Sequence, residues 1–198
     1  MQTIVKSDLQ LLKAHELYTT IKKADYITAN HSLRVACLSK IFVREYIPDV
    51  DFLKAFISGL LHDIGKLEMP KIYFTDRILC EAEKEIIHMH PFHSKLILSR
   101  TGIFDDEIII AVYQHHERAD KSGYPNQLPL EKLSSLGKIL AITDSFAAIT
   151  EDRHYKKKKS TKEAVDILLG DSKLYDSQIL ITFTDNIQNI LTKCNIKE

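Results

Sequence analysis

Apolar residues recur at intervals of three and four along almost the whole chain. In the segment 29–46, Val35, Leu38 and Phe42 share one helical face with His31, because a helix brings residues three and four apart to the same side. The same spacing predicts further helices, over residues 52–63, 81–89, 105–116, 130–150, 161–170 and 179–194, with one more beginning at Pro91. No segment shows the regular two-residue alternation of a half-buried strand. The pattern therefore predicts an all-α fold.

Glycine, proline and aspartate mark the predicted ends of these helices. Pro48 separates the first two helices, and Asp49 or Asp51 would cap the second one. Gly65 would end that second helix. The stretch 117–129 contains one glycine and two prolines, and its composition predicts the longest loop. These breaks predict a bundle of about seven to nine helices.

The chain of 198 residues suits a single domain, which would bury about 70% of its unfolded surface without needing disulfides. The sequence contains no repeat, no low-complexity linker and no second domain boundary. Residues 1–24 are predicted to form an N-terminal helical extension. Residues 25–198 are predicted to form the single helical bundle that carries the candidate chemistry.

Charge and cysteine content narrow the function classes. The 27 basic residues balance the 27 acidic ones, and a generic binder of nucleic-acid polymers or membrane surfaces would show a basic excess. The three scattered cysteines, Cys37, Cys80 and Cys194, indicate a reducing compartment. The chain starts without a signal-peptide core, and no apolar run approaches the roughly 20 residues that span a bilayer. We therefore expect a cytoplasmic protein with no membrane partner.

Histidine and aspartate on apolar helical faces supply the candidate chemistry. His62 and Asp63 are adjacent, and together they offer a nitrogen and a carboxylate that suit a divalent metal. A second pair, His115 and His116, lies about fifty residues later. Asp144 stands in an almost wholly apolar helix, where an ionised side chain is costly unless it is paired or binds a metal.

Each of these residues also has a simpler interpretation. Asp144 alone could make a helix–helix hydrogen bond, and His31 alone could be a satisfied core histidine. His88, His90 and His93 lie close together, and spacing alone does not rank them. These histidines and aspartates together are a more specific signal of a metal site than any one of them alone. Two adjacent metals are a known means of cleaving phosphate esters.

These residues fall in motifs through which the chain resembles the HD superfamily of metal-dependent phosphohydrolases, specifically its HD-GYP branch. The motifs run in family order from about residue 28 to residue 160: His31-Ser32-Leu33-Arg34-Val35, Leu61-His62-Asp63-Ile64-Gly65-Lys66, His90-Pro91, His115-His116-Glu117, Ser122-Gly123-Tyr124-Pro125, and Asp144 followed by Asp152-Arg153-His154-Tyr155-Lys156. The resemblance implies an all-helical domain that hydrolyses cyclic di-GMP to pGpG, to GMP or to both.

The resemblance also implies a two-metal site holding divalent transition-metal ions, typically iron or manganese. One ion would be held by His31, His62, Asp63 and Asp144. Asp63 would bridge to the second ion, which His90, His115 and His116 would complete. Some members hold a third ion through a glutamate one helical turn before the first histidine. Ile27 stands at that position here, so two ions are expected.

Further roles follow from the same resemblance. Asp63 and Lys66 would take part in catalysis, with Lys66 stabilising charge on the phosphoryl oxygens. Arg153 and Lys156 would bind the substrate phosphates. Tyr124 could contact the substrate, and a loop-packing role is an equal alternative.

The chain departs from the family pattern at three positions around the substrate pocket. Lys121 and Ser94 stand where glycines are usual, and Ala147 stands where a second acidic residue is typical. If the family glycine at position 121 has positive φ, Lys121 would be strained or the loop would shift. These departures leave two alternatives open. One is an HD phosphohydrolase acting on another nucleotide, and the other is a catalytically weak module that binds a dinucleotide or a signalling partner protein.

Overall fold

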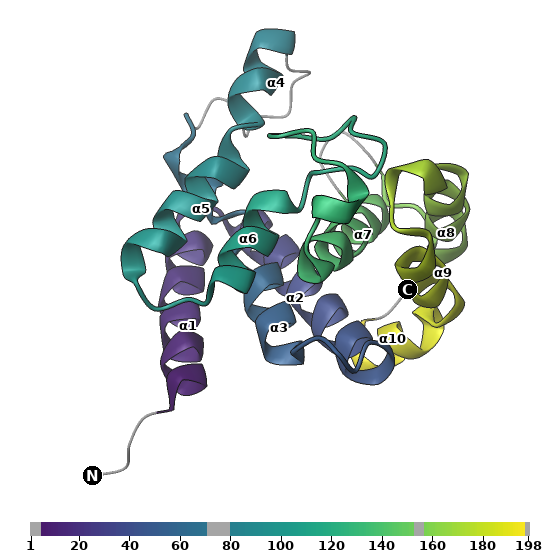
Figure 1. Cartoon of the computed structure of the whole chain (residues 1–198), viewed down its shortest axis with the longest axis horizontal. Coiled ribbons are helices and arrows are strands. Elements are labelled where there is room, and N and C mark those ends of the chain that lie inside the picture. The colour runs from purple at the N-terminus through teal and green to yellow at the C-terminus, as the bar shows by residue number, and fades with distance from the viewer. Residues whose placement is uncertain (1–4, 71–79, 153–156, 197–198) are drawn as a thin grey trace.

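The structure of the protein is a computed structural model that describes residues 5–70, 80–152 and 157–196. The described part is all-α and contains no strand, which confirms the predicted helical bundle (Figure 1). Its α-helices are α1 (Lys6–Ala24), α2 (Tyr26–Tyr46), α3 (Phe52–Leu61), α4 (Glu81–Ile87), α5 (His90–Thr101), α6 (Asp106–Gln114), α7 (Ser135–Thr150), α8 (Thr161–Gly170), α9 (Ser177–Asp185) and α10 (Ile187–Lys193). Short 3-10 helices are η1 (Ile64–Glu68), η3 (Leu130–Lys132) and η4 (Ser172–Leu174).

Helix α2 contributes to two hydrophobic clusters. One cluster joins it to α7 and the C-terminal helices, where the ring of Phe183 lies 5.1 Å from Phe42 and 5.5 Å from Phe146 between centroids. The other cluster joins it to α1, α3, α5 and α6 through fully buried residues such as Ile57 and Ile108. Burying each large apolar side chain contributes roughly 1.5–3 kcal/mol. In Figure 1, α1 lies at one side of the bundle and α8 to α10 at the other.

Aspartate side chains begin several of these helices. Asp25 caps α2, and its Oδ1 accepts hydrogen bonds from the backbone N–H groups of Ile27 and Thr28. Of the two predicted caps for α3, Asp51 is the one that serves, since its Oδ1 accepts from the N–H of Leu53 at 2.7 Å. Such caps satisfy N–H groups that have no partner inside the helix.

Two predicted helices are interrupted in the structure. The helix predicted over 130–150 is a 3-10 turn followed by α7, because the hydroxyl of Ser134 caps a fresh start by accepting from the N–H of Gly137 at 3.0 Å. The helix predicted over 179–194 is split into α9 and α10 at Asn186, whose side-chain amide donates to the carbonyl of Thr182. Periodicity alone does not register such polar interruptions, because the apolar residues on either side keep their spacing.

Gly65 does not end α3 as predicted. That helix ends at Leu61, and Gly65 lies within η1 with its backbone pressed against the start of α5. A Cβ on Gly65 would lie 2.1 Å from the carbonyl oxygen of His90 and 2.5 Å from the backbone nitrogen of Ser94. The glycine therefore permits a close approach between η1 and α5.

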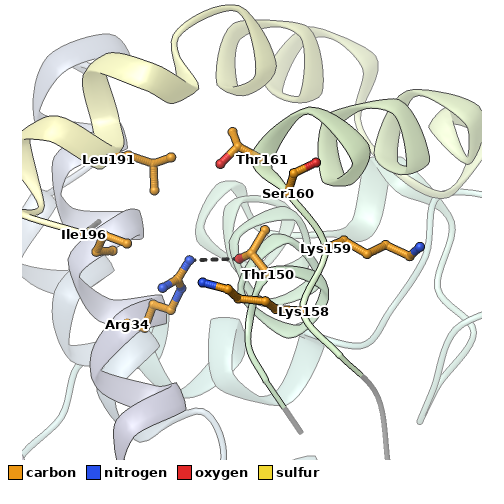
Figure 2. A pocket seen from close by; sticks show the side chains of 8 residues that line it. All are labelled: Arg34, Thr150, Lys158, Lys159, Ser160, Thr161, Leu191 and Ile196. Atoms are coloured by element: carbon orange, nitrogen blue, oxygen red, sulfur yellow. Dashed lines mark hydrogen bonds between the residues drawn. The ribbon is translucent and has the colours of Figure 1, made fainter. Parts of the chain in front are cut away.

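A cavity of about 290 Å³ opens beside α2, at the start of α8 (Figure 2). Its lining residues are Arg34, Thr150, Lys158, Lys159, Ser160, Thr161, Leu191 and Ile196.

No helix in the described part of the chain is both long enough and apolar enough to span a bilayer.

Candidate metal centre

Five segments far apart in sequence bring the predicted metal ligands together. His31 comes from α2 and Asp144 from α7, while the others stand at helix ends, namely His62 and Asp63 after α3, His90 at the start of α5, and His115 and His116 after α6. All are buried except His116, whose side chain is 20% exposed. Ligand atoms lie within 4.8 Å of one another in three groups: His31, His62 and Asp144; His62, Asp63 and His115; and His90, His115 and His116.

Close helix packing sets these positions. A Cβ on Gly59 of α3 would lie 2.7 Å from the Cα of Ala36 on α2, so glycine lets the two helices cross closely. Their histidines then meet, with the rings of His31 and His62 5.4 Å apart. The buried hydroxyl of Ser94 donates to the carbonyl of His62 and accepts from the N–H of Gly65, each at 2.8 Å. Ser94, one of the departures from the family pattern, thus ties α5 to the turn that carries two candidate ligands.

Three of the histidines are oriented in the same way, by a hydrogen bond between the ring and a backbone carbonyl oxygen. The Nδ1 atoms of His62, His90 and His115 lie 2.7, 2.7 and 2.6 Å from the carbonyl oxygens of Gly59, Ile87 and Val112. A carbonyl oxygen only accepts hydrogen bonds, so each Nδ1 carries the proton and each neutral ring keeps its lone pair on Nε2. All three histidines are therefore held with a free donor atom facing the centre.

This arrangement fits a cation. The Nε2 atoms of His90 and His115 lie 3.2 Å apart, and two lone pairs facing at that distance repel unless a positive charge lies between them. Nε2 of His62 and Oδ1 of Asp63 are buried and make no hydrogen bond, which is costly for polar atoms in a protein interior. Imidazole and carboxylate donors together suit divalent transition metals such as iron and manganese.

Asp63 lies between two of the histidines. Its Oδ2 is 3.3 Å from Nε2 of His62, and its Oδ1 is 3.1 Å from Nε2 of His90. Nζ of Lys66 also donates to Oδ2 at 2.6 Å. Burial opposes ionisation of Asp63, but the nearby positive charge, chiefly that of Lys66, outweighs burial and holds its pKa well below the usual range. An ionised carboxylate with one oxygen toward each histidine has the geometry of a bridging ligand.

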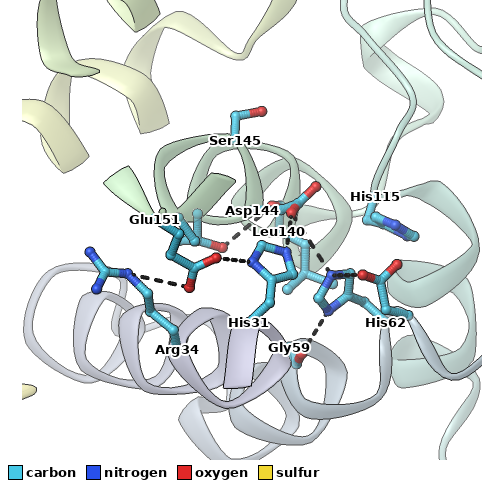
Figure 3. Close-up of polar contacts among 12 residues, drawn as sticks. His31, Arg34, Gly59, His62, His115, Leu140, Asp144, Ser145 and Glu151 are labelled. Atoms are coloured by element: carbon cyan, nitrogen blue, oxygen red, sulfur yellow. Dashed lines mark hydrogen bonds and ion pairs between the residues drawn. The ribbon is translucent and has the colours of Figure 1, made fainter. Parts of the chain in front are cut away.

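Asp144 reaches histidines from three other segments, and two of them, His31 and His62, are labelled in Figure 3. Its Oδ1 lies 2.9 Å from Nε2 of His31 and 3.8 Å from Nε2 of His62, and its Oδ2 lies 3.8 Å from Nδ1 of His116. Burial is again outweighed, chiefly by the hydrogen bond and charge of His31, so the pKa of Asp144 lies well below its usual range. Asp144 therefore does make a helix–helix hydrogen bond, to His31, which was the simpler interpretation of this residue. That bond is one contact within a larger polar cluster.

The histidines divide by charge environment. Burial lowers the pKa of His115 and of His116 well below the usual value, and neighbouring imidazoles add to the effect. Burial also acts against protonation of His31, but Asp144 and Glu151 outweigh it and raise its pKa to about 9. Neutral imidazoles are the form that binds metals, so His115 and His116 are already in that form.

The predicted substrate contacts are only partly placed. Lys66 points to Asp63, at the edge of the centre. The ring of Tyr124 stacks on His88, with centroids 3.9 Å apart, and lies 4.7 Å from the ring of His116. This placement beside a candidate ligand is compatible with both roles foreseen for the tyrosine. Arg153 and Lys156 lie outside the described residues.

The loop after α6 is fixed by a buried carboxylate to which no role was assigned from the sequence. Glu117 is 1% exposed, and its two oxygens accept hydrogen bonds from the backbone N–H groups of Asn126 and Leu128 at 2.7 and 3.0 Å. Tyr124 is held further by its own N–H, which donates to the carbonyl of His116. Glu117 therefore anchors the loop. Its position directly after His116 was the one feature of the sequence that could have indicated this role.

Lys121 adopts the left-handed conformation foreseen for its position, with φ of 66°. We expect Lys121→Gly to raise the free energy of unfolding by up to about 1 kcal/mol. The left-handed backbone costs a residue with a Cβ roughly 1–2 kcal/mol, and the entropy of glycine in the unfolded chain offsets roughly 0.5–1 kcal/mol of that gain. Urea denaturation measures the change. Lys121→Ala, which keeps the Cβ, is the control, and an equal gain there would assign the effect to the lysine side chain.

A second unforeseen carboxylate belongs to Glu151, which follows α7 directly. Its Oε2 lies 2.7 Å from Nδ1 of His31, and its Oε1 lies 3.7 Å from Nε of Arg34. Glu151 stands seven residues after Asp144, a spacing that returns to the same helical face. That spacing was the signal in the sequence, although nothing there indicated the distance to His31.

Comparisons with known proteins agree with this centre. A family model described as HD domain matches residues 11–179. The cyclic di-GMP phosphodiesterase PA4108 of Pseudomonas aeruginosa is 32% identical over 165 residues, covering 82% of this chain and 40% of that protein. The 3′3′-cGAMP-specific phosphodiesterase 1 of Vibrio cholerae is 33% identical over 166 residues, covering 81% of this chain and 38% of that protein. The chain thus spans about two fifths of the length of these curated relatives.

A solved structure shares the fold. The HD domain of the L. monocytogenes phosphodiesterase PgpH, in complex with cyclic-di-AMP, matches with a TM-score of 0.70 and 20% identity, covering 93% of this chain and 99% of that one. HD-domain phosphohydrolases are metal-dependent, and the histidine and aspartate groups found here are of the metal-binding kind. The chain belongs to the HD domain family, within the superfamily of phosphohydrolases that its motifs predicted.

Proposed function

We propose that this domain is a metal-dependent phosphodiesterase that hydrolyses a cyclic dinucleotide, with cyclic di-GMP as the expected substrate. The observation that carries the proposal is the position of Asp63 between two groups of ligands. His31, His62 and Asp144 form one group, and His90, His115 and His116 form the other, while Asp63 reaches a histidine of each. Two divalent ions, iron or manganese, would occupy these groups.

The chain's own residues would divide the work of hydrolysis. Two ions, when bound, would supply an activated water and would neutralise charge on the phosphodiester. Ionised Asp63 and Asp144 and the candidate histidines would hold the two ions, and water exclusion around these buried groups would strengthen their electrostatic effect. Lys66 would stabilise charge on the phosphoryl oxygens. Water adds to phosphorus, one P–O3′ bond breaks, and the 3′ oxygen takes a proton, giving linear pGpG and, after a second cleavage, GMP.

A second candidate is hydrolysis of a different cyclic dinucleotide. The relative from Vibrio cholerae, specific for 3′3′-cGAMP by its name, is as similar to this chain as the cyclic di-GMP enzyme. Two of the positions that depart from the family pattern border the centre, since Lys121 lies in the loop after α6 and Ser94 lies in α5. A weak enzyme that mainly binds a dinucleotide or a signalling partner protein is the non-catalytic alternative.

One assay separates these candidates. Protein purified without oxygen and loaded with Fe²⁺ or Mn²⁺ is incubated with cyclic di-GMP or with 3′3′-cGAMP, and the products are separated by chromatography. We expect about two metal ions per chain and linear product from cyclic di-GMP. Product from 3′3′-cGAMP alone would favour the second candidate. Nucleotide binding without product would favour the binding module, and absence of bound metal would defeat both enzyme proposals.

Two wider assignments belong with this proposal. We place the protein in the cytoplasm, where a cyclic dinucleotide signal and a reducing environment coincide. We also keep the division into an N-terminal helical extension, residues 1–24, and a catalytic domain, residues 25–198. Helix α1 packs on the rest of the bundle through buried residues such as Ala14 and Ile21.

A further inference from the structure

His31 differs from the other candidate ligands in what holds it. The Nδ1 atoms of His62, His90 and His115 contact neutral carbonyl oxygens. Nδ1 of His31 instead contacts the Glu151 carboxylate at 2.7 Å, while its Nε2 lies 2.9 Å from Asp144 (Figure 3). The imidazole therefore lies between two carboxylates, one on the side of the centre and one behind it.

A carboxylate behind an imidazole changes what the ring offers on its other side. It accepts the Nδ1 proton, which fixes the tautomer and leaves the Nε2 lone pair for a metal, and its negative charge makes that nitrogen more basic. A neutral carbonyl fixes the tautomer as well, but it contributes only a dipole. His31 is thus built to be a stronger donor than its neighbours.

Glu151 also forms a longer ion pair with Arg34, which comes from the same helix as His31. Nε of Arg34 lies 3.7 Å from Oε1 of Glu151, and its Nη2 donates to Oγ1 of Thr150 at 2.9 Å. The Thr150 hydroxyl donates onward to the carbonyl of Phe146. Arg34 also lines the cavity of about 290 Å³ at the start of α8 (Figure 2). The side chain of Glu151, 20% exposed, is therefore held between a buried histidine and an arginine at the wall of this cavity.

We propose that Glu151 is a positioning residue that sets the orientation and donor strength of His31, and so tightens the metal group formed by His31, His62 and Asp144. Its carboxylate lies behind the imidazole, on the ring nitrogen opposite to the one that faces Asp144, so it acts through His31. The role deepens the proposed function, because it presupposes that this group binds a metal.

The test compares metal binding by the full chain and by its variants, using titration of metal-free protein with Mn²⁺ against a chromophoric chelator. In Glu151→Ala we expect one of the two ions to bind about 10–100-fold more weakly, the usual effect of losing such an outer partner, and the other to keep its affinity. Glu151→Gln keeps an oxygen that accepts the Nδ1 proton, so we expect a smaller loss, of several fold, at the same ion. Glu131→Gln, which alters an exposed carboxylate in η3, is the matched control and should change nothing.

The outcomes distinguish this inference from the proposed function. If the unaltered chain binds no Mn²⁺, the proposed function fails. If it binds two ions and Glu151→Ala binds them equally well, only the positioning role is overturned. Complete loss of one ion in Glu151→Gln would mean that Glu151 is a direct ligand, and equal weakening of both ions would mean a general structural role; both results overturn the inference. Should the alanine variant fail to fold, the glutamine variant decides by the same criteria.

Discussion

Asp63→Asn is expected to lose bound metal and phosphodiesterase activity together. The carboxylate is 2% exposed and ionised, with one oxygen near His62 and the other near His90. An amide of the same size removes the negative charge that two cations would share and offers only one ligand oxygen. We expect turnover to fall by at least about a hundredfold, beyond the effect usual for an outer partner. Metal analysis and product chromatography on the same preparation measure both effects.

The control for this variant keeps the chemical change and moves it away from the centre. Asp166 is an exposed aspartate on α8, so Asp166→Asn should retain both metal and activity. Turnover at the unaltered rate in Asp63→Asn would contradict the bridging role. Loss of activity with both ions still bound would instead assign Asp63 a part in the chemistry without one in metal binding.

Gly65→Ala is expected to destabilise the domain and to weaken its metal centre. The new Cβ would lie 2.1 Å from the carbonyl oxygen of His90 and 2.5 Å from the nitrogen of Ser94. These are backbone atoms, so the clash can be relieved only by moving η1 away from α5. Forcing extra volume into a packed interior costs about 1–3 kcal/mol. The same movement would shift His90 relative to His62, so we also expect weaker binding of Mn²⁺.

Urea denaturation of the metal-free protein measures the first effect, and chelator competition measures the second. Gly170→Ala is the matched control, because a Cβ there meets nothing within 4 Å and the residue ends helix α8. Alanine should leave stability unchanged or raise it by up to about 1 kcal/mol. An unchanged unfolding free energy in Gly65→Ala would show that the approach of η1 to α5 can relax at little cost.

Helix periodicity was enough to predict the fold class, and burial chemistry was enough to predict that Asp144 needs a partner, since an ionised side chain on an apolar face must meet one when that face is buried. The full set of candidate ligands came from the resemblance to the HD superfamily, because spacing alone did not rank His88, His90 and His93. The breaks at Ser134 and Asn186 could not be read the same way, because they depend on local hydrogen bonds that leave the apolar spacing intact. A single sequence carries little information about such competition between side chain and backbone.

Contacts between residues far apart along the chain also could not be predicted from the sequence. Glu151 is 120 residues from His31, and only the packing of α7 against α2 brings the two together. The role of Gly65 was misjudged for a related reason: a glycine near a helix end is usually a cap, whereas here its missing Cβ makes room for a segment 25 residues later. The rule that glycine ends a helix depends on neighbouring residues only, whereas the contact between Gly65 and α5 joins two separate segments.

The helix ends beside the candidate ligands have an electrostatic consequence. Helices α3 and α6 end directly before His62 and His115, and the carboxyl end of a helix carries a partial negative charge of about half an electron from its aligned peptide dipoles. Both histidines therefore lie where a helix end favours positive charge, so the two helix ends would stabilise cations bound by His62 and His115. Asp63 is already paired with Lys66, and Asp144 with His31, whose pKa is raised to about 9. The direction of the two helices thus adds a preference for cations that the paired side chains alone would not provide.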